Sequence, residues 1–248
     1  MKLLHLKTYL VFIFLGCQFL YSQESYRVVY KITEPKMQGN MESLGEDGKQ
    51  FFKKAFEYAK GLKYVLTTTQ EESFFKLEDV LEKGDETPLE DILLKTAKRF
   101  TSFKNRVYID INKNKIVFEK NLINKNFIVQ RKQYIFNWKI KNATKKILGY
   151  NAKLATGEYY DEVVNKNKEV TAWFIPSIPI PIGPDIFMGL PGLIAEVEIE
   201  GAVVTMIEIN SSKTLEIQKI DTSEAISQKD FNELIGGLNN KLNDIIDN

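Results

Sequence analysis

Short stretches in which apolar and polar residues alternate recur along the chain, and this period of two is typical of strands with one buried face. In residues 106–111, three β-branched residues alternate with arginine, tyrosine and aspartate, and a polar turn and a second alternating stretch follow. The pattern predicts strands that include residues 26–33, 64–69, 73–77, 106–111, 116–120, 127–138, 148–156, 170–175, 193–199, 203–209 and 215–220. The chain is therefore expected to be rich in hairpins.

Three segments show the helical period instead. Apolar residues recur at helical spacing in residues 51–62, with lysines on the other face. A second helix is expected to begin at Thr87-Pro88-Leu89-Glu90, which has capping-box spacing and proline at the first helical position. Its predicted buried stripe is Leu89, Ile92, Leu93, Ala97 and Phe100. A C-terminal helix is expected after Ser227, with Gly236 and Gly237 bending or weakening it.

Together these patterns predict an α+β fold, in which about nine or ten mostly consecutive antiparallel strands form one sheet with helices on one face. Two helices are inserted early and one follows at the end. Residues 148–156 and 170–175 are expected to be joined by a polar aromatic connection at residues 159–162, and residues 210–213 to form a hairpin turn. No low-complexity linker divides residues 23–248, so they are interpreted as a single domain.

One segment, residues 173–194, matches neither period. It holds five of the seven prolines of the chain, interleaved with isoleucine, phenylalanine, methionine, leucine and glycine. Proline lacks an N–H and restricts the residue before it, so the segment must be extended or turning. Because its other side chains are apolar, it is expected to pack against its own domain or against a partner.

The N-terminus has the pattern of a secretory signal peptide. Lys2 and Lys7 precede an apolar run that is too short to span a membrane comfortably, and residues 1–22 are expected to be removed after Ser22. Cys17 allows a second interpretation as a lipoprotein cysteine, but apolar residues follow it where a lipoprotein would turn polar, so cleavage is preferred. The protein is thus expected to be periplasmic or extracellular, with no membrane span after cleavage.

Removal of this segment limits the chemistry that remains. It takes away His5 and Cys17, the only histidine and the only cysteine, which excludes Ser-His-Asp and cysteine catalysis, disulfides, and metal or haem sites built on these ligands. No cofactor is expected. Of the 34 basic residues, Lys2 and Lys7 also leave, so 32 basic residues balance 33 acidic ones. This balance gives no reason to expect binding to nucleic acid.

A set of ordered motifs resembles the GLPGLI family, secreted proteins of Bacteroidetes-type bacteria. The motifs are Gly189-Leu190-Pro191-Gly192-Leu193-Ile194, Ile147-Leu148-Gly149-Tyr150, Trp173, Ile178-Pro179 and Gly183-Pro184. In many members of that family a cysteine follows the Gly-Tyr pair by two residues, whereas this chain has Ala152 at that position. Any role of a thiol there is therefore absent from this chain. The resemblance implies export and an envelope setting, and no settled activity.

By analogy, the expected curved sheet with helices against its concave face is similar to the half-barrels of bacterial lipoprotein carriers, which hold an acyl chain. The first hypothesis is a non-catalytic envelope protein in which the two early helices cover the sheet and the proline-rich segment rims an apolar groove for a lipid or a partner protein. The candidate binding residues are Trp173, Pro176, Pro179, Gly183, Pro184, Phe187, Gly189, Leu190, Pro191 and Gly192. Alternatively, Gly189, Pro191 and Gly192 simply form the tight turn that begins the strand at Leu193.

The second hypothesis is a hydrolase that works with carboxylates alone, as glycosidases do. Its candidate residues are Asp161 and Glu162 in the tyrosine-rich connection and Asp185 in the proline-rich segment. Glu196, Glu198 and Glu200 lie at a period of two and are expected to form the solvated face of a strand.

Overall fold

A computed structural model describes residues 24–35, 43–78, 87–101, 103, 106–122, 125–162, 165–199 and 202–246. The predicted signal segment with Cys17, and Glu200, lie outside these residues. The strands are β1 (Ser25–Pro35), β2 (Lys63–Thr68), β3 (Glu72–Leu77), β4 (Arg106–Asp110), β5 (Lys115–Leu122), β6 (Lys125–Arg131), β7 (Lys139–Ile147), β8 (Tyr150–Asp161), β9 (Lys166–Ile175), β10 (Leu193–Ile199), β11 (Ala202–Ser212) and β12 (Ile226–Ser227). The helices are α2 (Glu46–Gly61), α3 (Pro88–Arg99) and α4 (Gln228–Ile246).

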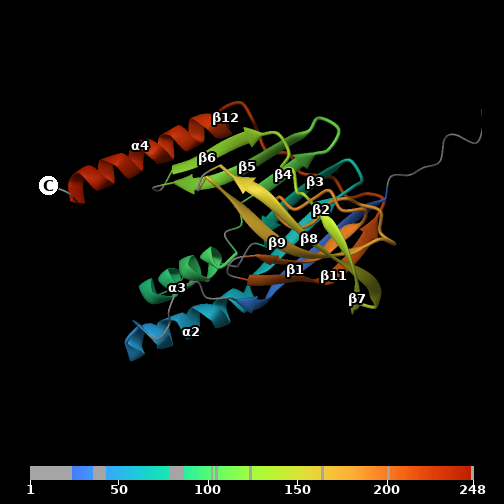
Figure 1. The fold of residues 1–248 in the computed structure, drawn as a ribbon, viewed down its shortest axis with the longest axis horizontal. Coiled ribbons are helices and arrows are strands. Elements are labelled where there is room, and N and C mark those ends of the chain that lie inside the picture. Colours follow the sequence, from blue (N-terminus) through green and yellow to red (C-terminus); the bar gives the residue numbers. More distant parts are fainter. Residues whose placement is uncertain are drawn as a thin grey trace, which may run out of the picture.

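Within the described residues, all twelve strands belong to one sheet, in the order β12-β6-β5-β4-β3-β2-β1-β11-β10-β9-β8-β7. Strands β2 to β6 and β7 to β11 are two runs of consecutive neighbours, and β1 joins the runs by pairing with both β2 and β11. The neighbours are antiparallel except for β12, which runs parallel to β6 over two residues. The predicted α+β class with a curved sheet is confirmed, and the structure shows that this sheet is open (Figure 1).

The region after β5 differs from the prediction of one long strand over residues 127–138. Strand β6 ends at Arg131, and residues 132–138 leave the sheet before β7 begins at Lys139. The aromatic residues of this departing segment pack inward, with the rings of Phe136 and Trp138 stacked at 5.2 Å, whereas Ile135 is 80% exposed. Strand β7 was missed because its lysine-rich residues are mostly exposed and show little apolar alternation.

The β7–β8 hairpin turns at Leu148 and Gly149, which have positive φ angles of 46° and 83°. Positive φ at both central residues is typical of the tight turn that suits the twist of a hairpin. The prediction that a strand begins at Leu148 was therefore wrong. The prediction of a connection at residues 159–162 was also wrong for its first three residues, because β8 continues through Asp161.

Residues 215–220 do not form the predicted strand, and β11 extends through the predicted turn to Ser212. The apolar residues at 217 and 220 instead pack on the face of the sheet that carries Phe74, here called the outer face. Ile220 joins a cluster with Phe74, Tyr108 and Val117, and Ile217 packs against it. The chain thus crosses this face, reaches the edge of the sheet at β12, and continues into α4.

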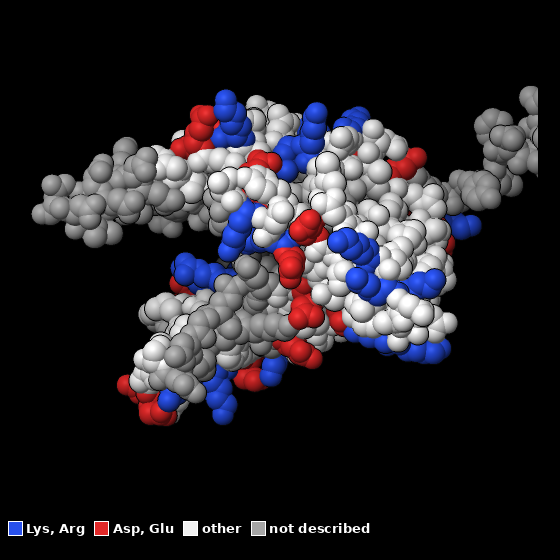
Figure 2. Space-filling view, in the orientation of Figure 1, with Lys and Arg blue, Asp and Glu red and all other residues white. Residues whose placement is uncertain are grey.

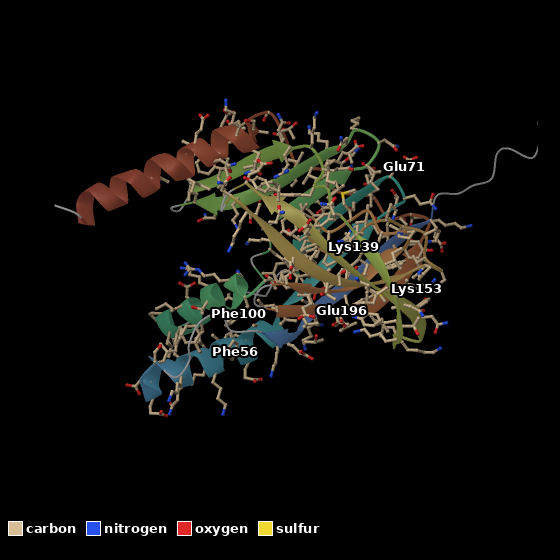
Figure 3. The ribbon with its side chains drawn as sticks, viewed as in Figure 1. Phe56, Glu71, Phe100, Lys139, Lys153 and Glu196 are labelled. Atoms are coloured by element: carbon tan, nitrogen blue, oxygen red, sulfur yellow. The ribbon has the colours of Figure 1, made fainter. Side chains whose placement is uncertain are left out.

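The helices were expected to cover the sheet, and for α2 and α3 this was wrong. They pack on each other, with Phe56 and Phe100 at 4.8 Å, beyond the ends of the central strands (Figures 1 and 3). Leu93 and Ala97 are buried as predicted, but Leu89 and Ile92 are about half exposed (51% and 52%). The capping box at Thr87 and Glu90 is present.

Helix α4 begins as predicted after Ser227, whose hydroxyl accepts a hydrogen bond from the backbone of Asp230 at 3.1 Å. Phe231 packs on Phe127 of β6 at 5.7 Å, whereas Leu234 is 45% exposed. The helix continues through Gly236 and Gly237. The side chains of Leu242 and Ile245 lie outside the described residues.

The main core lies on the face of the sheet that carries Val28, Tyr30 and Phe75, here called the inner face. Buried residues of β1 to β6 and β9 to β11 meet there with residues of the segment between β9 and β10. That segment, residues 176–192, is here called the proline loop. It therefore lies over the sheet face that the predicted groove would have occupied.

Candidate functional site

The proline loop runs between two neighbouring strands, since β9 and β10 pair from Ile175 and Leu193 onward. Its apolar side chains are buried and alternate with exposed positions. Ile178, Ile180 and Ile182 are at most 5% exposed, while Pro176 and Pro179 are exposed. This alternation shows why proline is accepted there: its missing N–H does not leave a buried donor unpaired.

Backbone hydrogen bonds hold the loop as a small ladder of its own. Gly183 N–H donates to Phe187 O at 2.8 Å, and Gly189 N–H donates to Pro181 O at 2.8 Å. Leu193 and Ile194 donate to Ile178 O and Ile182 O at 2.9 and 3.0 Å. The loop is thus tied both within itself and to the start of β10, which satisfies polar groups of a buried backbone.

Two glycines are required by close approach. A Cβ at Gly192, where φ is +153°, would lie 2.3 Å from the carbonyl oxygen of Ile175. A Cβ at Gly183 would lie 2.5 Å from Cβ of Ile194. At both positions the backbone passes against its neighbour so closely that a side chain cannot be accommodated.

An aromatic cluster fixes the inner side of the loop. Phe187 is 2% exposed, and its ring lies 5.5 Å from Phe136 and 6.3 Å from Tyr159. Trp138 donates its indole N–H to the carbonyl oxygen of Met188 at 2.9 Å. The segment before β7 and the loop therefore brace each other, although 50 residues separate Trp138 from Met188.

The tip of the loop reaches the base of the helical pair. Asp185 is 4% exposed and has a positive φ of 53°. Burial, and to a lesser degree the charge of Asp185, raise the pKa of Tyr64 to about 12, opposed by a hydrogen bond with Thr101. The Tyr64 and Thr101 hydroxyls lie 3.3 Å apart. Asp185 is therefore buried beside the core and not presented to solvent.

Trp173 is separated from the rest of the predicted site. Its neighbour Phe174 is on the inner face, and successive side chains of a strand point to opposite faces. Lys145 Nζ lies 4.6 Å from the Trp173 ring centre and 2.6 Å from a Glu196 carboxylate oxygen. The expectation that Glu196 is simply solvated was wrong, because it also accepts from the Thr205 hydroxyl at 2.9 Å.

The remaining nine predicted site residues lie together in the loop, in two groups. Pro176, Pro179, Gly189 and Pro191 are exposed, and Gly183, Pro184, Phe187, Leu190 and Gly192 are buried. The alternative interpretation of the motif as a turn fits this placement, since Gly192 sits where the loop enters β10. The exposed members are three prolines and one glycine, whereas the apolar side chains of the loop are buried.

The acidic residues of the hydrolase hypothesis are distributed differently. Asp161 pairs with Lys168 at 3.2 Å, and Glu162 pairs with Arg131 at 3.1 Å. Asp185 is buried within the proline loop. The three carboxylates are thus not brought together in one site, and none of them lines the pocket on β8 and β9.

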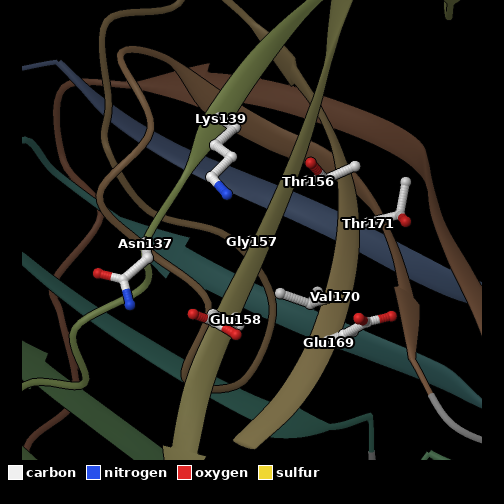
Figure 4. Close-up of a pocket in the computed structure, with 8 residues that line it drawn as sticks. All are labelled: Asn137, Lys139, Thr156, Gly157, Glu158, Glu169, Val170 and Thr171. Atoms are coloured by element: carbon white, nitrogen blue, oxygen red, sulfur yellow. The ribbon is translucent and has the colours of Figure 1, made fainter.

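A pocket of about 310 Å³ lies on β8 and β9 (Figure 4). Thr171, which lines it, is two residues before Trp173 in β9 and therefore points to the same face of the sheet. It is lined by Asn137, Lys139, Thr156, Gly157, Glu158, Glu169, Val170 and Thr171. Glu158 and Glu169 are directly opposed in the antiparallel register. Sequence reasoning missed this pocket because the pairing of β8 with β9, and the inward packing of Trp138 over Gly157, set which side chains meet.

The described residues hold no group of three or more histidine, cysteine, aspartate or glutamate residues placed to bind a metal ion. None of the helices in this part of the chain combines the length and the apolar character needed to cross a bilayer.

Comparison with known proteins gives one partial match. Residues 155–196 match a family model described as "Protein of unknown function (Porph_ging)". The match spans most of β8, all of β9, the proline loop and the start of β10. No curated protein matches the chain. The part of the chain that is built around the loop is thus similar to a family whose function is uncharacterised.

Proposed function

We propose that this chain is a non-catalytic binding protein of the cell envelope that meets its partners at its surface, while the proline loop holds the curved sheet in shape. The observation that carries the proposal is the burial of the loop. Ile180, Ile182 and Leu190 are at most 1% exposed, on the inner face where a lipid carrier would hold its ligand.

Moving the loop aside for an acyl chain would be costly. Fully exposing a buried leucine, isoleucine or phenylalanine side chain costs about 1.5–3 kcal/mol, so exposing the five largest of the loop would cost roughly 10 kcal/mol. Domains are stable by only about 5–15 kcal/mol. Opening the loop would therefore approach the free energy of unfolding, which favours binding at the surface over enclosure of a lipid.

The proposed export rests on the sequence. Residues 1–22 have the charge and apolar pattern of a signal peptide, and the chain that would remain has no cysteine to form disulfides. A protein of this kind must be stable through its core alone. The loop contributes to that core, which fits a structural role.

The ion pairs of Asp161 and Glu162 speak for a non-catalytic role over the hydrolase. A glycosidase needs one carboxyl group with a raised pKa, usually through burial away from cations. Asp161 and Glu162 instead form ion pairs with Lys168 and Arg131 at 3.2 and 3.1 Å. Asp161→Asn and Glu162→Gln are expected to change the free energy of unfolding by little. The unsubstituted protein and both variants are expected to show no turnover of glycan or ester substrates.

Native mass spectrometry of the protein purified gently from its own envelope tests the proposal. The expected result is a chain with no stoichiometric lipid. A lipid that is present at one per chain and identified by extraction would overturn binding at the surface and restore the lipid-carrier hypothesis. Loading with a fluorescent fatty acid gives an independent check, because a filled inner face should leave its emission unchanged.

A further inference from the structure

The sheet has one edge at β7, whose sole neighbour in the described sheet is β8. The opposite edge differs, since β12 pairs there with β6 and leads directly into α4, which packs on β6 through Phe231 and Phe127. An edge strand presents unpaired backbone N–H and C=O groups that can pair with another extended chain. Strand β7 is nine residues long, which is enough to accept an added strand.

The charge of this edge is one-sided. Residues 139–156, which include β7 and the first half of β8, contain Lys139, Lys141, Lys145, Lys146 and Lys153 and no acidic residue. Figure 3 labels Lys139 and Lys153 on these strands, and Figure 2 shows basic side chains over the same region. Within the part of the chain that the structure describes, Lys145 is the one of these five lysines that forms an ion pair, with the carboxylate of Glu196.

Lysines at an edge disfavour pairing with a second copy of the same strand, because like charges would then face each other. The same charges favour a strand of opposite charge. A register shift between Ile140 and Thr144 interrupts the regular ladder, so an added strand would pair on either side of it. Ile140 is 53% exposed and offers an apolar contact beside the lysines.

We infer that β7 binds an extended, acidic segment of a partner protein, which adds to the sheet as a further antiparallel or parallel strand. Main-chain hydrogen bonds to β7 would supply affinity, and glutamate or aspartate side chains at alternate positions would contact the lysines. This inference names the partner class for the surface binding proposed above and rests on that proposal.

Fluorescence anisotropy with a labelled nine-residue peptide of alternating glutamate and valine tests the inference. Matched peptides are a lysine–valine peptide of reversed charge and a glutamate–valine peptide with alternate backbone nitrogens methylated. The first peptide is expected to bind at low salt and to weaken as salt is raised, because exposed charges are screened. Both matched peptides are expected to bind at least tenfold more weakly.

Variants locate the binding. Lys139→Glu with Lys141→Glu should weaken binding of the acidic peptide at least tenfold. Lys53→Glu with Lys54→Glu makes the same change of charge on the exposed face of α2 and should leave affinity within twofold. Hydrogen exchange of the complex should show slowed amides in residues 139–147. Circular dichroism of each variant confirms that the sheet is retained.

Equal binding of the methylated peptide, equal weakening by both lysine pairs, or slowed amides elsewhere would overturn strand addition at β7. The inference would also be overturned if the protein self-associates and the Lys139→Glu, Lys141→Glu variant changes that self-association. The partner would then be a second copy of the chain. These failures differ from that of the proposed function, which fails if a stoichiometric lipid is found, whatever the peptide does.

Discussion

Gly192 lies where the proline loop enters β10, and the backbone of β9 leaves no room for a side chain there. Substitution with alanine would place Cβ 2.3 Å from Ile175 O at a φ of +153°, so either the loop or β9 must shift. Strain and overpacking of this kind each cost about 1–3 kcal/mol. Gly192→Ala is expected to lower the free energy of unfolding by roughly 2–5 kcal/mol, measured by urea denaturation.

Gly61→Ala is the matched control, because a Cβ at this last residue of α2 would meet nothing within 4 Å. It is expected to leave stability unchanged or to raise it by up to about 1 kcal/mol. If both alanine variants have the same stability, the close approach of the loop to β9 does not constrain the fold, and the structural role of Gly192 is refuted.

Tyr64 links stability to pH. Burial raises its pKa in the folded protein to about 12, above the usual value of 10. A raised tyrosine pKa means that its stabilising contribution is complete below pH 10 and is lost as the pH rises toward 12. The free energy of unfolding should fall by up to about 1.4 kcal/mol per pH unit in this window from Tyr64 alone.

Tyr64→Phe removes the titrating hydroxyl and should reduce that slope, measured by urea denaturation at several pH values between 9 and 11.5. Its absolute stability at pH 8 reports separately on the lost contact with Thr101. An unchanged slope in the variant would mean that Tyr64 titrates normally and is not buried beside Asp185.

At the scale of elements, some sequence patterns predicted the observed helices and strands and others did not. The capping box at Thr87 and the helix start at Ser227 were predictable because side chains close in sequence form them. The hairpin of β4 and β5 was predictable from its alternation. Strand β7 was not, since its lysines lie at an edge with little burial, and the residues 215–220 alternate because they cross the outer face and not because they pair.

The candidate site was predictable in membership but not in role. Proline and apolar spacing located the loop and indicated that it packs, yet did not say on which side. That depends on the contacts of Phe136 and Tyr159 with Phe187 and on the hydrogen bond from Trp138 to the loop backbone, which no local pattern contains. Trp173 was assigned to the same site by motif order, whereas strand alternation places it on the other face.

Helix α3 offers a test of a local signal. The Thr87 hydroxyl accepts from Glu90 N–H, and the Glu90 carboxylate accepts from Thr87 N–H at 2.8 Å. Thr87→Ala removes the first bond and is expected to cost about 1 kcal/mol. Thr96→Ala, in the same helix, removes a back-bond to Ile92 O and should be neutral or slightly stabilising.

Urea denaturation measures both variants, and hydrogen exchange of residues 88–99 shows whether the loss is local to α3. Because α2 and α3 pack on each other at the end of the sheet, destabilisation is expected to raise exchange in both helices before the sheet. Equal effects of the two threonine substitutions would contradict a role for the capping box.

At the scale of the whole molecule, the two runs of strands share β1, and the proline loop fills the face that they curve around. The core is thus continuous from the aromatic cluster at Phe187 to Tyr30, whose hydroxyl donates to Ile194 O at 2.7 Å. Phe187→Ala should therefore act on the entire fold and lower the free energy of unfolding by about 3–5 kcal/mol. Pro179→Ala, at an exposed position of the same loop, should cost less than about 1 kcal/mol.

Calorimetry or urea denaturation distinguishes these two loop variants, and a single cooperative transition is expected for each. If Phe187→Ala leaves global stability intact and alters only the exchange of the loop, the loop is an independent flap on a sheet that is stable without it.

The most direct test is native-state hydrogen exchange of Gly183, Gly189, Leu193 and Ile194, whose amides are bonded within the loop and at its entry to β10. If the loop is part of the core, these amides exchange only through global unfolding, with opening free energies within about 1 kcal/mol of the amides of β1 and the same dependence on denaturant. Opening free energies several kcal/mol lower, with little dependence on denaturant, would show a lid that moves on a folded sheet and would contradict the structural role of the loop.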